Sequence, residues 1–296
     1  MIFYINRKDL NVEKYDACIK NALNSRIYAF SWYLDIVADH WDTLILNDYE
    51  AVMPLPWRQK YLIKYIYPPV WTQQLGVFAV HEISEILVKD FLNAIPKKFR
   101  KITIQFNSGN HLSGENVTEK VNYILPLDKS YDELFKNFRK DRRDRIKQNL
   151  EKNNLFDDQF EINKLITIFK KNYKNKIELS ENDYLKLEML VKKMNIVEDV
   201  SVKIILDKEK DFVKAGAIFV ISKKRIVYLF SSQTDEGRKQ NSLNAIINKV
   251  IKDNANSDKL LDFEGSIIPN LADFFKSFGA KKESYFWYQK PFRNFL

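Results

Sequence analysis

Residues 261–279 read LDFEGSIIPNLADFFKSFG, and this stretch decides the fold. Residues Lys259–Phe263 predict a strand, and a helix is expected from Pro269 to Phe278. Asp262 and Glu264 lie two residues apart at the strand's end, so both carboxylates project from one face. Ligands bind outside the carboxyl ends of strands in open α/β sheets, which makes both residues site candidates. The alternative is that one of them caps the following helix or pairs with a lysine.

The same order of elements occurs twice along the chain. Between residues 12 and 127 the pattern predicts two helices, three strands (the third over 61–70), a helix and two further strands. Residues 161–289 repeat this order. Two tandem copies of one α/β unit is the economical interpretation. We therefore expect an α/β fold of the mixed α+β kind, in which residues 1–128 and 154–296 each form a twisted mixed sheet flanked by helices.

A basic stretch separates the two copies. Residues 131–153 predict one long helix, and residues 136–152 carry eight basic and three acidic side chains. We expect residues 129–153 to connect the two domains. The alternatives for this stretch are contact with tRNA, contact with an anionic lipid or nucleotide-linked acceptor, and plain solvation. The candidate contacts to tRNA phosphates are Arg139, Arg142 and Arg143.

Charges and reactive side chains narrow the class of protein. The 296 residues hold 48 Lys and Arg against 39 Asp and Glu, a net charge of +9. Residues 1–128 hold 14 of each sign, so the excess belongs to the later residues. The single cysteine, Cys18, excludes an intrachain disulfide and a cysteine zinc site, no histidine follows His111, and we expect no metal. Neither a signal peptide nor an apolar run of membrane-spanning length is visible, so we expect a cytoplasmic protein.

A glycine-containing loop precedes the helix predicted from Ser242. Gly237 and Arg238 lie in this loop. A loop of this kind at a helix N-terminus presents free N–H groups and a positive dipole to a phosphate. Polar loops before helices also occur without any ligand, so the motif alone leaves the anion site open.

Together these segments resemble the GNAT-like acyltransferase superfamily. The resemblance rests on a strand with Gly216, the strand 227–231, the loop with Gly237 and Arg238, the segment 261–266 and the run 271–279. It is greatest to the double-domain branch, with its Fem-type peptidoglycan peptidyltransferases and FemAB-like acetyltransferase domains. Phe275-Lys276-Ser277-Phe278-Gly279 is similar to the Phe-Lys-x-Phe-Gly run of the Fem-type enzymes, and residues 138–143 are similar to their basic helix. The loop at Gly237 has one glycine where GNAT enzymes carry two, and no second polar helix forms a tRNA arm.

The resemblance implies two GNAT-like domains, with acceptor contacts in the first and donor contacts in the second. It implies an N-acyltransferase that moves an acyl group from acyl-CoA, such as acetyl-CoA, to an amine. Lys276 would stabilise the oxyanion, and Glu264 or Asp262 would accept the proton. Phe275 would shape the acyl pocket. The candidate donor contacts are Gly237, Arg238, Ser242 and Ser231.

Aromatic residues of the first domain are the candidate acceptor contacts, although a role in the core is the plainer interpretation. They are Trp57, Tyr67 and Trp71. The expected acceptor is a small molecule or a cell-envelope precursor. Two other functions remain open: a Fem-type transfer from aminoacyl-tRNA to a cell-wall precursor, and an inactive GNAT-like module that binds RNA or an anionic surface.

Overall fold

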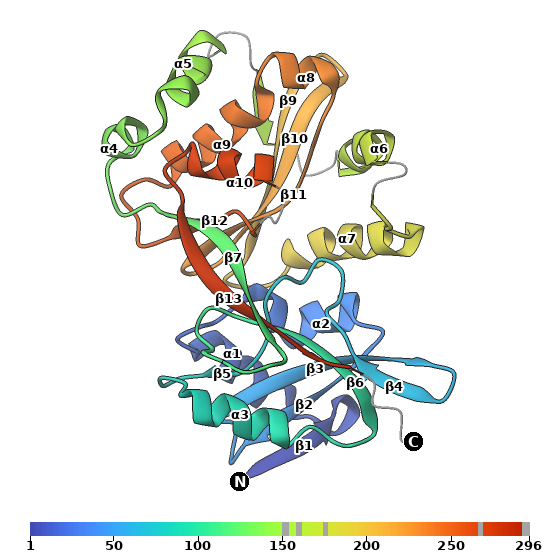
Figure 1. The fold of residues 1–296 in the computed structure, drawn as a ribbon. Helices are drawn as coiled ribbons and strands as arrows, with labels where there is room; N and C mark the ends of the chain where they lie inside the picture. Colours follow the sequence, from blue (N-terminus) through green and yellow to red (C-terminus); the bar gives the residue numbers. More distant parts are fainter. Residues whose placement is uncertain (150–153, 158–161, 174–176, 266–268, 292–296) are drawn as a thin grey trace. The chain divides into compact units, whose positions relative to one another are not determined.

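The computed structural model describes residues 1–149, 154–157, 162–173, 177–265 and 269–291 (Figure 1). The chain divides into two compact units. The first contains Met1–Val121 and the chain from Ser284, and the second contains Asn122–Glu283. This division differs from the predicted one, in which residues 1–128 formed the first domain and residues 129–153 a separate connector.

The first unit is a mixed sheet with three α-helices. Its strand order is β1–β2–β3–β4–β6–β13, in which β4 and β6 are parallel and the other neighbours antiparallel. Its elements are β1 (Ile2–Asn6), α1 (Val12–Asn21), α2 (Ser31–Val37), β2 (His40–Leu46), β3 (Ala51–Lys60), β4 (Ile63–Ile66), β5 (Phe78–Ala79), α3 (Glu85–Asn93), β6 (Phe99–Phe106) and parts of β7 (Val117–Pro126) and β13 (Lys281–Lys290). Ser84 caps α3 by accepting from the Leu87 amide, and α3 buries Val88 and Phe91 in the core.

The second unit repeats this arrangement. Its strand order is β7–β12–β11–β10–β9–β8, in which β11 and β12 are parallel and the other neighbours antiparallel. Its further elements are α4 (Tyr131–Lys136), α5 (Lys140–Asn149), β8 (Leu155–Asp157), α6 (Ile162–Tyr173), α7 (Glu181–Met194), β9 (Ser201–Glu209), β10 (Phe212–Ile221), β11 (Arg225–Gln233), α8 (Asp235–Lys239), α9 (Ser242–Asp253), β12 (Leu260–Asp262) and α10 (Pro269–Lys276). Each unit thus has one parallel pair near one end of its strand order. The predicted fold class is confirmed.

The last strand of each sequence copy is exchanged. β7 follows β6 in the chain, yet Ile124–Pro126 pair with β12 of the second unit. β13 follows α10, yet Phe286–Lys290 pair with β6 of the first unit. Because of this exchange, the boundary between the units lies between Val121 and Asn122 instead of at residue 128. The order of elements along the chain assigns each strand to its own copy, so it does not predict an exchange.

The predicted single helix over 131–153 is two helices, α4 and α5, and both belong to the second unit. The helix breaks because Phe138 turns inward, where its ring lies 5.2 Å from Phe135 and 5.3 Å from Phe278. The Arg139 amide then donates to the Ser277 carbonyl at 2.9 Å instead of continuing α4. Residues 150–153 of the predicted helix lie outside the described residues.

A glycine is required in the loop that follows β4. Gly76 has a φ of +100°, and a Cβ there would lie 2.2 Å from Asn110 Oδ1. The buried Asn110 amide holds Val77 in both directions, because Oδ1 accepts from the Val77 N–H at 2.7 Å and Nδ2 donates to its carbonyl at 2.9 Å. The loop therefore has a fixed backbone.

We expect Cys18 to be unreactive in the folded protein. Cys18 packs in α1 with 5% of its surface exposed, and this burial raises the pKa of its thiol to about 11. The thiolate is the reactive form, so labelling by a disulfide reagent at pH 8 should be at least roughly a hundredfold slower than for a free cysteine. Stopped-flow absorbance measures this rate. Rapid labelling of the native protein at the unfolded rate would contradict the packing of α1.

Candidate active site in the second unit

The parallel strands β11 and β12 separate soon after they meet. They pair over Arg225–Val227 and Leu260–Asp262, and β11 then continues to Gln233 while β12 ends. Just beyond this point Leu229 is an extra residue in β11, because Tyr228 lies opposite Phe219 and Phe230 opposite Ile218. β-Bulges of this kind redirect side chains and are over-represented next to active sites. The end of β12 is therefore the candidate active site.

A buried ionic cluster holds the strands where they separate. Arg225 pairs with both Asp262 and Glu283, and its Nη2 lies 2.6 Å from Glu283 Oε1. Asn122 Nδ2 donates to Asp262 Oδ1 at 2.9 Å and to Glu283 Oε2 at 3.0 Å. Burial opposes the charge on Arg225, but the two carboxylates outweigh it and raise the pKa above its ordinary value. Asp262 is 1% exposed, and its carboxylate is bound by Arg225 and Asn122. These contacts are typical of a structural residue.

Glu264 follows the cluster in a strained conformation. Its φ is +52°, which is uncommon for a residue with a side chain. Two hydrogen bonds fix the segment: the Glu264 N–H donates to Asp262 Oδ1 at 3.0 Å, and the Gly265 N–H donates to Asn122 Oδ1 at 2.7 Å. Glu264 is half-buried on this fixed backbone.

An aromatic cluster lies beside this segment and contains Phe275. The Phe275 ring stacks on Phe263 at 4.7 Å and lies within 6.3 Å of both Tyr123 and Tyr228. Lys276, the next residue, is exposed, and its Nζ lies 5.7 Å from the centre of the Tyr123 ring. Since the Phe263 N–H donates to the Tyr123 carbonyl at 2.9 Å, the structure brings Lys276, Phe275 and Glu264 to the same end of β12.

The predicted phosphate loop at Gly237 is instead part of a short helix, α8. Thr234 caps this helix, and its Oγ1 accepts from the Gly237 N–H at 3.1 Å. A Cβ on Gly237 would lie 2.3 Å from the carbonyl oxygen of Lys214, so close packing of α8 on β10 explains the glycine. The N–H that was expected to meet a phosphate is therefore already bonded.

The other predicted donor contacts differ in their surroundings. Arg238 is exposed and pairs with Asp235 at 3.3 Å within α8. Ser242 is fully buried at the start of α9, and its Oγ has no hydrogen-bond partner among the described residues. Ser231 is half-buried on β11 and shares a side-chain hydrogen bond with Tyr228, whose pKa is raised by burial.

The three arginines of the basic stretch differ in their partners. Arg139 pairs with Asp141 at 2.6 Å and with Asp273 at 2.9 Å, and Arg143 Nη1 donates to the carbonyls of Lys136 and Phe138. Arg142 is 3% exposed, with Nε on Ser277 Oγ at 2.8 Å and its guanidinium over the rings of Phe274 and Phe278. Burial, together with Arg145, lowers its pKa to about 10. Arg142 forms no ion pair within the part of the chain that the structure describes.

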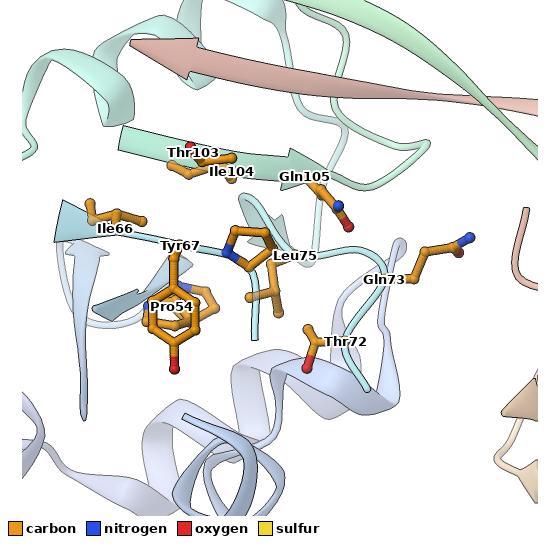
Figure 2. Close-up of a pocket in the computed structure, with 11 residues that line it drawn as sticks. Pro54, Ile66, Tyr67, Thr72, Gln73, Leu75, Thr103, Ile104 and Gln105 are labelled. Atoms are coloured by element: carbon orange, nitrogen blue, oxygen red, sulfur yellow. The ribbon is translucent and has the colours of Figure 1, made fainter. Parts of the chain in front are cut away.

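The first unit has a cavity at its own parallel pair. β4 leaves β6 after Ile66 and returns at Leu75, whose N–H donates to the Gln105 carbonyl at 2.7 Å. Figure 2 shows the cavity between Thr103–Gln105 of β6 and the segment from Ile66 to Leu75. Its volume is about 10 Å³, which is the size of one water molecule rather than of a substrate group.

Of the predicted acceptor contacts, Tyr67 lines this cavity and the other two do not. Burial raises the pKa of Tyr67, its hydroxyl accepts from the Asp39 N–H, and Arg58 lies 4.1 Å from the centre of its ring. Trp57 stacks on His40 at 4.4 Å and donates to Asp42, as a packed strand residue does. Trp71 has a φ of +63°, and its carbonyl accepts from the Tyr33 hydroxyl.

Comparison with known proteins identifies the fold. No protein-family model and no curated protein matches the chain. FemX matches with a TM-score of 0.67 at 12% identity, over 94% of this chain and 96% of FemX. L-PGS from Bacillus licheniformis matches with a TM-score of 0.55 at 12% identity, over 96% of this chain and 93% of that one. A tandem GNAT protein from the clavulanic acid biosynthesis pathway matches with a TM-score of 0.52 at 9% identity, over 99% of both chains. The chain has a tandem GNAT-like fold.

The sequence did not predict the buried residues that fix the backbone at the end of β12. Asn122, Arg225 and Glu283 are far apart in the chain, and only the strand register brings them together. Thr234 three residues before Gly237 was an available signal, since a threonine at that spacing is typical of an N-cap. No group of three or more His, Cys, Asp or Glu side chains within the described ranges is placed to hold a metal ion.

We expect removal of the buried cation to destabilise the second unit strongly. Arg225→Gln leaves Asp262 and Glu283 buried without a counter-charge, which typically costs about 3–5 kcal/mol. Chemical denaturation measures the free energy of unfolding. The matched control is Arg238→Gln, which removes an exposed pair and should cost less than about 0.5 kcal/mol. Equal effects of the two substitutions would contradict a structural role for the cluster.

Proposed function

We propose that this protein is an acyltransferase that moves an activated acyl group onto an amine. The proposal is supported by the tandem GNAT-like fold and by the residues that meet where β11 and β12 separate. Transfer of this kind requires a positioned carbonyl, stabilisation of the oxyanion and an acceptor for the amine proton. The end of β12 offers an exposed cation, Lys276, and a half-buried carboxylate, Glu264.

The donor we propose is aminoacyl-tRNA, which reverses the order favoured by the sequence. This choice rests on the cap of α8. The Gly237 N–H already donates to Thr234 Oγ1, and the Lys214 carbonyl oxygen packs directly against Gly237. A pyrophosphate loop needs such N–H groups to be free. Acyl-CoA remains the second candidate, because the β11–β12 pairing ends at Val227 and a bulge at Leu229 follows it in β11.

Arg142 is the proposed contact to a tRNA phosphate. Arg139 and Arg143 already have acceptors, whereas the Arg142 guanidinium bonds Ser277 and lies over two aromatic rings but forms no ion pair among the described residues. A guanidinium that stays charged without an ion pair is suited to a phosphate. This assignment narrows the predicted contact from three arginines to one.

Glu264 is the proposed proton acceptor and Lys276 the proposed oxyanion contact. Asp262 is left out of the chemistry because Arg225 and Asn122 engage it. We propose a cell-envelope precursor that carries an amine as the acceptor, by resemblance to the Fem-type enzymes. Tyr67 lines only a water-sized cavity in the first unit, so we propose no acceptor contact there.

We expect the protein to bind tRNA, and we expect the contact between Arg142 and a phosphate to contribute to the salt dependence of this binding. Arg142→Gln should weaken the binding and reduce the slope of log K against log[salt] by roughly 1, the value for one phosphate contact. Arg142→Lys restores the charge and should restore the slope. The measurement is fluorescence anisotropy of labelled tRNA at salt concentrations between roughly 50 and 200 mM.

The matched control for Arg142 is Lys192→Gln, an exposed lysine on α7, which should leave the slope unchanged. Calorimetry with acetyl-CoA in parallel separates the two donors. Binding of acetyl-CoA without binding of tRNA would overturn the choice of donor. Tight tRNA binding without any transfer would leave an inactive binding module.

We expect Glu264→Gln to slow transfer by roughly 10²–10⁴ while leaving the affinity for tRNA unchanged, because a general base acts in the chemical step. The assay follows a radiolabelled amino acid from tRNA to a precursor peptide with a lysine amine. Lys276→Ala should also lower the rate, and Lys281→Ala, an exposed lysine on β13, is its control. Full activity of Glu264→Gln would exclude this residue as the base.

A further inference from the structure

The hairpin between β3 and β4 ends in exposed apolar residues. Tyr61 and Leu62 join the two strands, with 84% and 94% of their surfaces exposed, and Ile63 is 40% exposed. Figure 1 shows this hairpin, in light blue, projecting from the rest of the first unit. The sequence predicted a strand over 61–70, and that prediction was wrong at its start because apolar residues occupy a turn.

The composition of this hairpin tip, defined as Tyr61 and Leu62, is unusual for a turn. Tyr61 has a φ of +54°, a conformation in which glycine, asparagine and aspartate are favoured. Its carbonyl accepts from Gln59 Nε2, and its ring lies 6.0 Å from Lys60 Nζ. An aromatic side chain in a strained turn that is almost fully exposed does not contribute its apolar surface to the core. Burial in the core therefore does not account for these two residues.

Basic side chains surround the base of the hairpin. Lys60 and Lys64 lie on the hairpin itself, and the register places Phe99 and Lys101 of β6 opposite Lys64 and Tyr65. We define the basic collar by its members, which are Lys60, Lys64, Lys97, Lys98, Arg100 and Lys101. All but Lys64 are exposed, although residues 1–128 carry no net charge as a whole. The positive charge of the first unit is thus concentrated behind an apolar tip.

We propose that the hairpin tip inserts into the surface of an anionic lipid bilayer, with the basic collar against the headgroups. An amphipathic aromatic ring and an aliphatic side chain are the residues that favour the membrane interface. Lysines within a Debye length of anionic lipids add electrostatic attraction. No helix in the described parts of the chain is long and apolar enough to cross a membrane. The inference does not depend on the proposed transfer reaction.

The first test is co-sedimentation with vesicles. We expect the protein to pellet with vesicles of phosphatidylglycerol and phosphatidylcholine, to pellet weakly with phosphatidylcholine alone, and to be released by salt. Leu62→Asp should weaken the binding roughly tenfold or more. The matched control is Ile86→Asp, at an apolar position on α3 that is 72% exposed, and it should bind like the unsubstituted protein. Equal binding of all three proteins, or no binding to anionic vesicles, would overturn the proposal.

The second test places a reporter at the tip. Because Cys18 is buried, a Leu62→Cys variant can be labelled selectively with an environment-sensitive fluorophore. Its emission should shift to the blue on anionic vesicles, whereas the same label on Ile86→Cys should not shift. Thermal unfolding of each variant checks that the fold is intact. A shift at both positions, or a shift at Leu62→Cys with tRNA but not with vesicles, would contradict insertion of the tip into lipid.

Discussion

Arg225 lies between two carboxylates, Asp262 and Glu283, at the point where β11 and β12 stop pairing. Because these charges are buried, each needs its partner to offset the cost of desolvation. The partners meet only when the strands are paired in this register. Asn122 completes the cluster and also holds the Gly265 amide, which places Glu264 in its strained conformation. The geometry of the candidate site therefore depends on this buried ion pair.

The exchange of β7 and β13 supplies two of these four residues. Asn122 comes from β7, the last strand of the first sequence copy, and Glu283 comes from the start of β13, the last strand of the second. Without β7, Asp262 would lose its amide partner and β12 its antiparallel neighbour. The exchange is thus part of the site and accounts for the difference between the predicted and observed boundaries.

The order of elements and the fold class were predictable from hydrophobic periodicity, which is a local property of the chain. Contacts distant in sequence were not, as the pairing of Arg225 with Glu283 shows. The segment at Gly237 forms a capped helix instead of the predicted loop, and the close approach to Lys214 explains the glycine there. Tyr61 and Leu62 were placed in a strand because their side chains favour one. Both local signals were real, but the tertiary structure placed Gly237 in a short helix and Tyr61 and Leu62 in a turn.

We propose that the acyl end of the donor binds where β11 and β12 separate, beside Glu264 and Lys276, and hydrogen–deuterium exchange tests this proposal most directly. The measurement compares the free protein with its complex with a non-hydrolysable analogue of the aminoacylated tRNA end. The account predicts slower exchange in residues 228–233 and 271–278, where the open edge of β11 faces the aromatic cluster. Protection confined to residues 235–244, or none in the second unit, would contradict it.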